Sequence, residues 1–392
     1  MRESREFENA GIPRFTLTHL HKANIISRKF PANLLPLEYL LLEKPEKILI
    51  VRLSALGDVV RCLPALTALR TAFPEAHIGW AVEKRFADLV EGHPDIDETI
   101  ILPRKDWTRR LKNPLRIPAL LVEVASSFRS LRKKSYDVAV DFQGNLRSGI
   151  VTGISGARRR IGFAASHARE HSHKFYTECF SPPLGTHRLM WNMLMLSKLG
   201  IENPAVVWRT TQNTEETAHA KEFLGRLDSS GPVVIIHPGT SRFGTFKRWP
   251  PERFAGVAKR LRDELGAVPV LTGGPGEREL CEEVAGLAQG SAAVAPQMSL
   301  RRLAALIAEA SLFVGADTGP LHIAVAAGVP VVAIFGPKDP AKYGPFGENC
   351  EVVTADLPCR PCTRRRCDRA DCMTAITVDM VFESAKKNLA RG

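Results

Sequence analysis

One stretch, residues 312–340, constrains the fold of this 392-residue chain more than any other. Leu312–Ala316 is a short apolar run typical of a buried strand, and a second such run covers Val331–Phe335. Between these runs the sequence predicts a buried helix over Leu321–Ala327, with Pro320 in its first turn. Two buried strands joined by a helix form a β-α-β unit, and such units build parallel sheets.

The turn Asp317-Thr318-Gly319 connects the first of these strands to the helix. Free backbone N–H groups and the helix dipole make such a helix amino terminus a binding site for phosphate. A plain capped turn is the alternative, because every α/β protein has several. His322 lies on the first turn of the helix and is placed to face whatever this turn binds; a satisfied core histidine is the alternative.

Strands and helices alternate in two blocks of the chain. The alternation predicts an α/β fold with two doubly wound, mostly parallel sheets that face each other across a cleft. The expected segments are an N-terminal extension (1–45), a first domain (46–215), a second domain (216–377) and a C-terminal helix (378–392).

The sequence predicts three local features between residues 34 and 118. Leu34–Leu42 is expected to form a short amphipathic helix in the extension. The helical run Val59–Ala72 contains Pro64, so this helix either kinks or starts near residue 63 with Asp58 on a loop before it. The polar, proline-rich stretch Pro103–Pro118 is predicted to be a loop or an irregular insertion.

The net charge of +12 is concentrated in one segment. Ile101–Phe175 contains 16 lysines and arginines but only five acidic residues. Such a cluster attracts phosphates, anionic lipid headgroups or nucleic acid, and a solvated basic face is the alternative. The aromatic residues of the segment do not alternate with its lysines and arginines, and no RNA-binding or DNA-binding module is legible, which argues against nucleic acid.

Successive strand ends of the second block carry groups that bind phosphate. They are Thr240, Ser241, Lys247, the loop Gly273–Gly276, Thr318 and Gly319. Glu277 can accept hydrogen bonds from ribose hydroxyls, or it serves only as a favourable partner of a helix dipole. Neither a GxGxxG nor a GxxxxGK[ST] motif is present, which argues against a nicotinamide dehydrogenase and a P-loop kinase.

Asp58 is the candidate general base of the first block. It follows the first strand on a glycine turn, where a carboxylate can take the proton of a reacting hydroxyl. A plain helix cap is the alternative.

Four separated motifs carry a resemblance to a known family. They are RLSALGDVVRCLPAL (52–66), DFQGNLRS (141–148), HPGTSRFGTFKRWP (237–250) and GADTGPLHIAVAAGVPVVAIFGP (315–337). Together they resemble the ADP-heptose:lipopolysaccharide heptosyltransferases of glycosyltransferase family 9. DFQGNLRS and AREHSHKFY (168–176) look closest to the first heptosyltransferase, which adds heptose to the Kdo of the lipid A core.

The resemblance implies a GT-B fold and an inverting, metal-independent, single-displacement transfer. Asp58 matches the general base of the family, and Lys247 matches the lysine that holds the donor phosphates. The donor-binding turn corresponds to Asp317, Thr318, Gly319 and His322. The expected acceptor-binding residues are Ser54, Gly57, Gln143 and Arg147.

Four cysteines lie within 14 residues: Cys359, Cys362, Cys367 and Cys372. Their spacing indicates a structural zinc or iron site, and the interspersed arginines offer an anionic ligand as the alternative. No cofactor is expected for catalysis. The only DxD motif, Asp95-Ile96-Asp97, is interpreted as structural rather than as a metal site.

These observations predict a cytoplasmic glycosyltransferase, peripheral on the inner face of the inner membrane. The expected partners are ADP-heptose and a Kdo-lipid A or related core acceptor, without nucleic acid. One alternative is an enzyme of the same fold that uses another nucleotide sugar or acceptor, since the site residues do not distinguish hexose from heptose. A second is a nucleic-acid-binding protein, and a third is a sugar-nucleotide epimerase.

Overall fold

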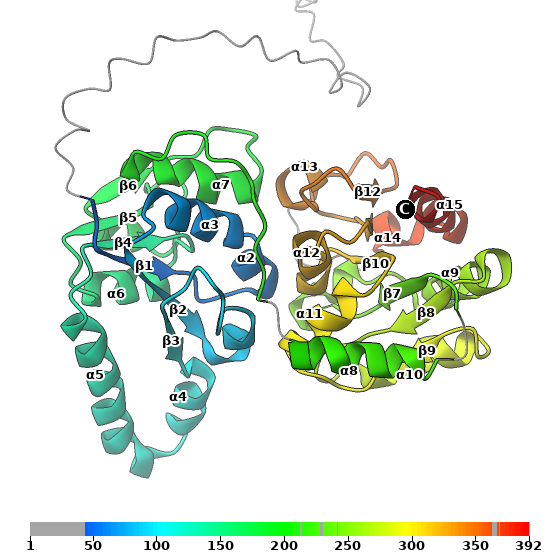
Figure 1. Ribbon diagram of the computed structural model, residues 1–392, viewed down its shortest axis with the longest axis horizontal. Coiled ribbons are helices and arrows are strands. Elements are labelled where there is room, and N and C mark those ends of the chain that lie inside the picture. Colours follow the sequence, from blue (N-terminus) through cyan, green and yellow to red (C-terminus); the bar gives the residue numbers. More distant parts are fainter. Residues whose placement is uncertain are drawn as a thin grey trace, which may run out of the picture. The chain divides into compact units, whose positions relative to one another are not determined.

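Two six-stranded sheets, each entirely parallel, organise the chain (Figure 1). The computed structural model describes residues 44–392 except for 212–213, 228–229, 241, 363–366, 368 and 392. Residues 44–392 belong to one unit. The predicted N-terminal extension, including its helix at residues 34–42, lies outside the described residues apart from residues 44 and 45.

The first sheet has the strand order β3-β2-β1-β4-β5-β6. Its strands are β1 (Lys47–Val51), β2 (His77–Glu83), β3 (Glu98–Leu102), β4 (Val138–Asp141), β5 (Arg159–Phe163) and β6 (Glu178–Phe180). In β1 every residue after Lys47 is buried, because helices cover both faces of a parallel sheet of this kind.

The second sheet has the order β12-β11-β10-β7-β8-β9. Its strands are β7 (Val233–His237), β8 (Val268–Leu271), β9 (Ala293–Val294), β10 (Leu312–Ala316), β11 (Val331–Ile334) and β12 (Cys350–Val353). Counted from its own first strand, each sheet has the order 3-2-1-4-5-6, and the winding reverses between β1 and β4 and between β7 and β10. The predicted α/β fold of two doubly wound sheets is therefore confirmed.

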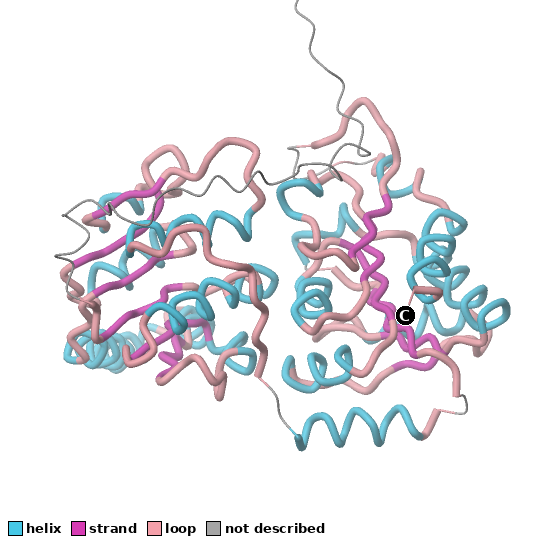
Figure 2. Tube along the Cα trace, turned by 45° about the horizontal axis from the view of Figure 1, so that its top comes forward, coloured by secondary structure: helices cyan, strands magenta, loops and turns pink. Residues whose placement is uncertain are grey.

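Helices pack on both faces of each sheet (Figure 2). In the first half (residues 44–211) they are α2 (Leu56–Val60), α3 (Leu63–Ala72), α4 (Arg104–Arg110), α5 (Ile117–Lys133), α6 (Leu146–Ile154) and α7 (Arg188–Met195). In the second half (residues 214–391) they are α8 (Thr214–Gly225), α9 (Pro251–Leu265), α10 (Arg278–Leu287), α11 (Leu300–Ala308), α12 (Gly319–Ala326), α13 (Pro340–Tyr343), α14 (Asp371–Thr374) and α15 (Val378–Leu389). On the second sheet, α11 and α12 cover one face while α9 and α15 cover the other.

The helical run after β1 is divided in two. The second helix, α3, begins at Leu63 with Pro64 in its first turn, as one of the two alternatives predicted. Asp58, however, lies in the short helix α2 and not on a loop. The prediction of a loop was wrong because α2 is stabilised by its packing against α12, a contact that is distant in the sequence.

The predicted irregular insertion at Pro103–Pro118 was also wrong. It contains α4 and a 3-10 turn, and its last two residues begin α5. Trp107 of α4 donates from Nε1 to Oε1 of Glu123 of α5 over 2.9 Å, and its ring meets that of Phe128 edge to face. These side chains hold the two helices together, which polar composition alone did not indicate.

The domain limits stay a prediction in their details. Strands of the first sheet fall within residues 47–180 and those of the second within 233–353, on either side of the predicted boundary. The boundary at residues 215 and 216 falls inside α8, which packs against α11 of the second half. Within the described residues, no helix combines the length and the apolar character needed to cross a membrane.

Candidate functional site

Four turns at the carboxyl ends of the central strands surround one cavity of about 1470 Å³. They follow β1, β4, β7 and β10, the strands between which the winding of each sheet reverses. Ligands of doubly wound sheets bind at this position, because the turns on either side of the reversal diverge and leave a crevice. Residues of both halves line the cavity, so the predicted cleft between the two sheets is present.

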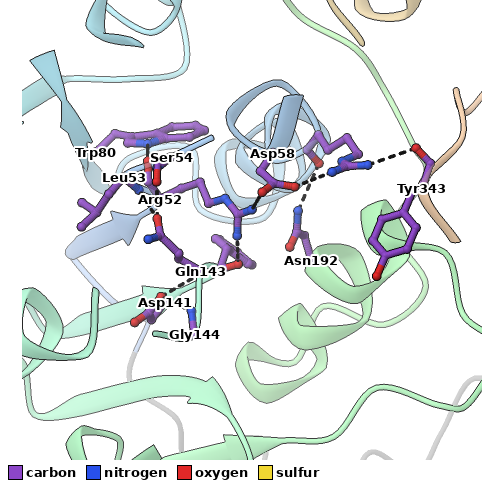
Figure 3. Close-up of polar contacts among 12 residues, drawn as sticks. Arg52, Leu53, Ser54, Asp58, Trp80, Asp141, Gln143, Gly144, Asn192 and Tyr343 are labelled. Carbon is purple, nitrogen blue, oxygen red and sulfur yellow. Dashed lines mark hydrogen bonds and ion pairs between the residues drawn. The ribbon is translucent and has the colours of Figure 1, made fainter. Parts of the chain in front are cut away.

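Asp58 lies in this cavity between two arginines (Figure 3). Its Oδ2 is 2.7 Å from Nη2 of Arg52, its Oδ1 pairs with Arg61, and its side chain is 33% exposed. Burial alone would raise the pKa of this carboxyl, but the two guanidinium groups hold it well below its usual range. Asp58 is therefore ionised at neutral pH, and its partners are arginine side chains rather than the helix amino terminus that a cap would bind.

Gln143 fixes the turn that carries Asp58. Its Oε1 accepts from the backbone N–H groups of Leu53 (2.8 Å) and Ser54 (3.0 Å). The carboxylate of Asp141 accepts in turn from the N–H groups of Gln143 (2.8 Å) and Gly144 (3.0 Å) (Figure 3). Gln143, predicted to bind the acceptor, lines the cavity and also connects the ends of β1 and β4.

Gly57 and His322 bring the two halves into contact above the cavity. A Cβ atom on Gly57 would lie 2.5 Å from Cδ2 of His322, so only glycine allows α2 to approach α12 this closely. Burial, together with the positive charge of Arg61, lowers the pKa of His322 well below its ordinary value. The imidazole is therefore neutral at physiological pH, and it lines the same cavity as Asp58.

The second half contributes groups suited to phosphate. Nζ of Lys247 lies 2.5 Å from Oδ2 of Asp317, and both residues line the cavity. The hydroxyl oxygens of Thr240 and Thr318 are buried and make no hydrogen bond with any residue that the structure describes, although both residues line the cavity. A buried hydroxyl without a partner is costly, so both point to a polar ligand. Ser241 lies outside the described residues.

Glu277 is placed against the turn that follows β7. A Cβ on Gly239 would lie 2.2 Å from Oε2 of Glu277, so glycine is needed for this approach. Oε2 accepts from the N–H of Gly274 over 2.7 Å and is 3.8 Å from Nε2 of His237. Glu277 lines the cavity with its other oxygen not engaged in any hydrogen bond among the described residues, which leaves an acceptor for a ligand hydroxyl.

Two predicted acceptor-binding residues do not line the cavity. Ser54 contributes its backbone N–H to Gln143, and Arg147 pairs with Glu83 over 3.3 Å. The side chain of Arg147 is 45% exposed. The acceptor-binding role of Ser54 and Arg147 stays a prediction.

Both carboxylates of the DxD motif are engaged within the first half. Asp95 pairs with Arg209 over 2.8 Å and accepts from the hydroxyl of Thr67 over 3.2 Å. Asp97 pairs with Arg70 over 2.5 Å and accepts from the N–H of Ile78 over 2.7 Å. These contacts agree with the structural interpretation of the motif.

The four-cysteine segment follows β12. Cys359 and Cys367 are exposed and Cys372 is buried. Burial, together with the nearby thiols of Cys359 and Cys367, raises the pKa of Cys372. Within the part of the chain that the structure describes, no three His, Cys, Asp or Glu side chains are grouped so that they could hold a metal ion. The residues 363–366 and 368 lie outside that part, and the metal site stays a prediction.

Several cavity residues were not found from the sequence. They are Arg52, Arg61, Arg188, Trp191, Lys338 and Tyr343. Arg61 follows Asp58 by three residues, but Asp58 was expected on a turn before the helix, so the helical spacing that pairs them was not predicted. Arg188 and Lys338 gave no local signal, since they line one cavity only in the folded chain.

Comparisons with known proteins agree with this geometry. The model of glycosyltransferase family 9 (heptosyltransferase) matches residues 124–372. Lipopolysaccharide heptosyltransferase 1 of Pseudomonas aeruginosa is 29% identical over 322 residues, which cover 82% of this chain and 87% of the relative. The protein of the same name from Escherichia coli O18:K1:H7 is 30% identical over 316 residues, with coverage of 79% and 91%.

A solved structure, the E. coli heptosyltransferase WaaC with ADP, is similar over 87% of this chain and 99% of that chain. The TM-score is 0.70 and the sequence identity is 26%. The two-sheet fold, the cavity between the sheets and these matches together assign the chain to one family: it belongs to glycosyltransferase family 9, the heptosyltransferases.

Proposed function

We propose that this glycosyltransferase moves heptose from ADP-heptose to a Kdo-containing lipid A or inner-core lipopolysaccharide acceptor. One observation carries the proposal: an ionised carboxylate, Asp58, shares a cavity with the phosphate-binding groups around Lys247. The names of the similar proteins support heptose as the sugar and lipopolysaccharide as the acceptor class.

The transfer is a single displacement. An acceptor hydroxyl oxygen attacks the anomeric carbon of the heptose, and the bond from that carbon to the β-phosphate oxygen breaks. ADP leaves with the electron pair, and Asp58 takes the proton of the hydroxyl as the new bond forms. The arginines make Asp58 a weak base, so the proton moves late, when bond formation has made the hydroxyl acidic.

The leaving ADP gains negative charge in the transition state, and the second half supplies partners for it. Lys247 provides a point charge, the amino terminus of α12 provides N–H groups, and the buried hydroxyls of Thr240 and Thr318 can donate. Lys247 then binds the donor phosphates in place of Asp317, or binds both at once. These groups can stabilise the leaving group without a divalent ion.

The test is release of ADP from purified protein given ADP-heptose, with and without Kdo-lipid A, in the presence of EDTA. Acceptor-dependent release is expected. Release without any acceptor would indicate hydrolysis or an epimerase-like reaction. No release from ADP-heptose, with turnover of another nucleotide sugar, would contradict the heptose assignment and retain the fold.

We also propose that the enzyme docks on the anionic inner face of the membrane through the hairpin of α4 and α5. Four apolar side chains of this hairpin are exposed: Leu111 (53%), Leu115 (91%), Leu121 (60%) and Val122 (71%). Residues 104–134 contain ten lysines and arginines and two acidic residues. Apolar side chains among cations fit the interface of an anionic bilayer.

The position of α4 supports this docking surface. Lys105, near the start of α4, lines the cavity, while the exposed Leu115 lies beyond the other end of α4. A lipid-linked acceptor held at the membrane by its acyl chains would thus reach the cavity beside the same hairpin.

A structural zinc or iron ion at the four cysteines is a separate proposal, supported by their number and spacing. About one metal ion per chain is expected in protein purified under reducing conditions, measured by plasma emission spectroscopy. Replacing Cys359 and Cys372 by serine should remove the metal, whereas replacing the exposed Cys179, outside the cluster, should not. Metal-free wild-type protein that unfolds at the same temperature with and without added zinc would contradict the proposal.

A further inference from the structure

Beside Asp58 the wall of the cavity is built by both halves of the chain. Nε2 of His187, just before α7, lies 3.1 Å from the carbonyl oxygen of Gly344, just after α13. Arg61 donates to the carbonyl oxygen of Tyr343 over 3.3 Å, and Asn192 of α7 donates to that of Arg61 over 3.1 Å (Figure 3). Side chains of Arg61 and His187 therefore meet the backbone at the end of α13, next to the proposed base.

Arg188, the first residue of α7, is held in one orientation by Trp191. Its guanidinium carbon is 3.6 Å from the centre of the Trp191 ring. The indole is itself fixed, because its Nε1 donates to the carbonyl oxygen of Thr186 over 3.1 Å and His167 packs on it edge to face. A guanidinium stacked on an indole keeps its N–H donors in the open plane, where a carboxylate or phosphate binds.

Lys338 approaches the same place from the second half. Its Nζ is 5.7 Å from the centre of the Tyr343 ring, and the guanidinium carbon of Arg188 is 5.5 Å from the same centre. Burial alone would raise the pKa of Tyr343, but a hydrogen bond from Arg188 and the charge of Arg188 lower it. The charges of Lys338 and Lys342 lower it further. The environment of the ring is thus strongly positive, and both Arg188 and Lys338 line the cavity.

The two cations lack a carboxylate partner. No Asp or Glu among the described residues forms an ion pair with Arg188 or Lys338, whereas Arg52, Arg61 and Lys247 all have one. Both side chains are partly buried. Two partly buried cations on one cavity wall, without a carboxylate partner among the described residues, leave positive charge uncompensated, so the arrangement favours a negatively charged ligand group.

We propose that Arg188 and Lys338, one from each half, form a subsite for an anionic group of the acceptor, with Trp191 as the residue that positions Arg188. The inference rests on the proposed function for the identity of the acceptor, a sugar acid. Its carboxylate is the expected ligand. Both cations approach the ring of Tyr343, whose carbonyl oxygen accepts from Arg61, a partner of Asp58. The donor phosphates already have Lys247 and α12, so the acceptor is the substrate that the subsite serves.

The test compares Arg188→Gln and Lys338→Gln with wild type, using Kdo-lipid A and its carboxyl methyl ester as acceptors. Each substitution should raise KM for Kdo-lipid A about tenfold or more, the effect of one charge-assisted hydrogen bond, with kcat and KM for ADP-heptose unchanged. With the methyl ester, the variants and wild type should have equal KM values. Lys259→Gln and Arg226→Gln, which remove charges outside the cavity, are the matched controls.

A second acceptor distinguishes the carboxylate of the sugar acid from the phosphates of lipid A as the group that is bound. If the variants lose their effect on Kdo-lipid A from which the lipid phosphates have been removed, and keep it on the methyl ester, the subsite binds a lipid A phosphate and the carboxylate assignment is wrong. A raised KM for ADP-heptose would place the cations at the donor and overturn the proposal.

Direct binding keeps this test independent of turnover. Wild type should bind free Kdo in titration calorimetry, and Arg188→Gln should weaken this binding about tenfold or more. Binding without any turnover would contradict the proposed function and leave the subsite standing, whereas wild type that does not bind the sugar acid overturns the subsite. Trp191→Ala should raise KM for the acceptor with little change in kcat, and Trp191→Phe should restore it, because a phenyl ring can still orient Arg188.

Discussion

At the scale of single residues, the charge state of Asp58 depends on its neighbours. Arg52, just after β1, and Arg61, just after α2, hold the carboxylate ionised and fix its direction. This pairing makes Asp58 a weaker base than a lone carboxylate and a better oriented one. Orientation of a catalytic group toward the reacting hydroxyl is worth more than basicity in a displacement whose proton moves late.

Asp58→Asn should therefore abolish most of the transfer and leave donor binding intact. The amide cannot accept the hydroxyl proton, and a fall in kcat of about 10²–10⁴ is expected for loss of a general base. Acceptor-dependent ADP release measures kcat, and titration calorimetry measures ADP binding. Asp263→Asn, at an exposed position on α9, is the control. Turnover of Asp58→Asn within twofold of wild type would exclude Asp58 as the base.

Gly57 has a steric role that belongs to the same scale. Gly57→Ala should destabilise the protein by about 1–3 kcal/mol, the usual cost of overpacking, because its Cβ would lie 2.5 Å from the ring of buried His322. Urea unfolding measures the change. Gly225→Ala is the control, since a Cβ there meets no atom within 4 Å. Equal stability of the two variants would contradict the prediction, because α2 and α12 would then move apart without a cost in the free energy of unfolding.

At the scale of elements, prediction from sequence worked for the central strands and failed for α4. Strands such as β10 are short apolar runs between turns. A strand that is buried on both faces of a parallel sheet must be apolar throughout, so its sequence carries a local signal. The segment of α4 and the turn after it carries prolines and charges that suggest a loop. Its helix is supported by contacts of Trp107 with α5, and a contact partner 16 residues away leaves no local signal.

The hairpin yields a prediction about membrane binding. Replacing Leu115 and Leu121 by glutamate should reduce co-sedimentation with phosphatidylglycerol vesicles at least about tenfold, because it removes apolar contact and adds repulsion from the lipid. ADP binding in solution should be unchanged. Leu184 and Leu287 replaced by glutamate serve as controls, since both are exposed outside the hairpin. Equal binding to phosphatidylcholine vesicles would contradict the role of charge.

At the scale of the whole molecule, buried neutral histidines make the free energy of unfolding depend on pH. Burial lowers the pKa of His187 to about 4, and its ring contacts Gly344 of the second half. Burial also lowers the pKa values of His93, His237 and His322. The unfolded chain binds protons near pH 6.5, where the folded chain does not, so the free energy of unfolding falls as the pH drops below that value.

Thermal unfolding should therefore show decreasing stability between about pH 6.5 and 4. His187→Gln should flatten this slope by up to about 1.4 kcal/mol per pH unit, the contribution of one proton. Differential scanning calorimetry across the pH range measures it, with His219→Gln, on the surface of α8, as the control. A slope unchanged by His187→Gln would show that this histidine is protonated in the folded protein.

The sequence by itself determined the two α/β blocks, the turns at the strand ends and the candidates Asp58, Lys247 and Thr318. Each gives a local signal, an apolar run that stops at a polar turn, and parallel strands bring their carboxyl ends to one edge. Only the tertiary structure decided what these residues contact. Asp58 meets Arg52 because β1 ends beside α2. Arg188 and Lys338, 150 residues apart in the chain, both approach the ring of Tyr343 because α7 and the segment after β11 adjoin. Pairings between distant segments depend on how the sheets wind, and no local pattern records them.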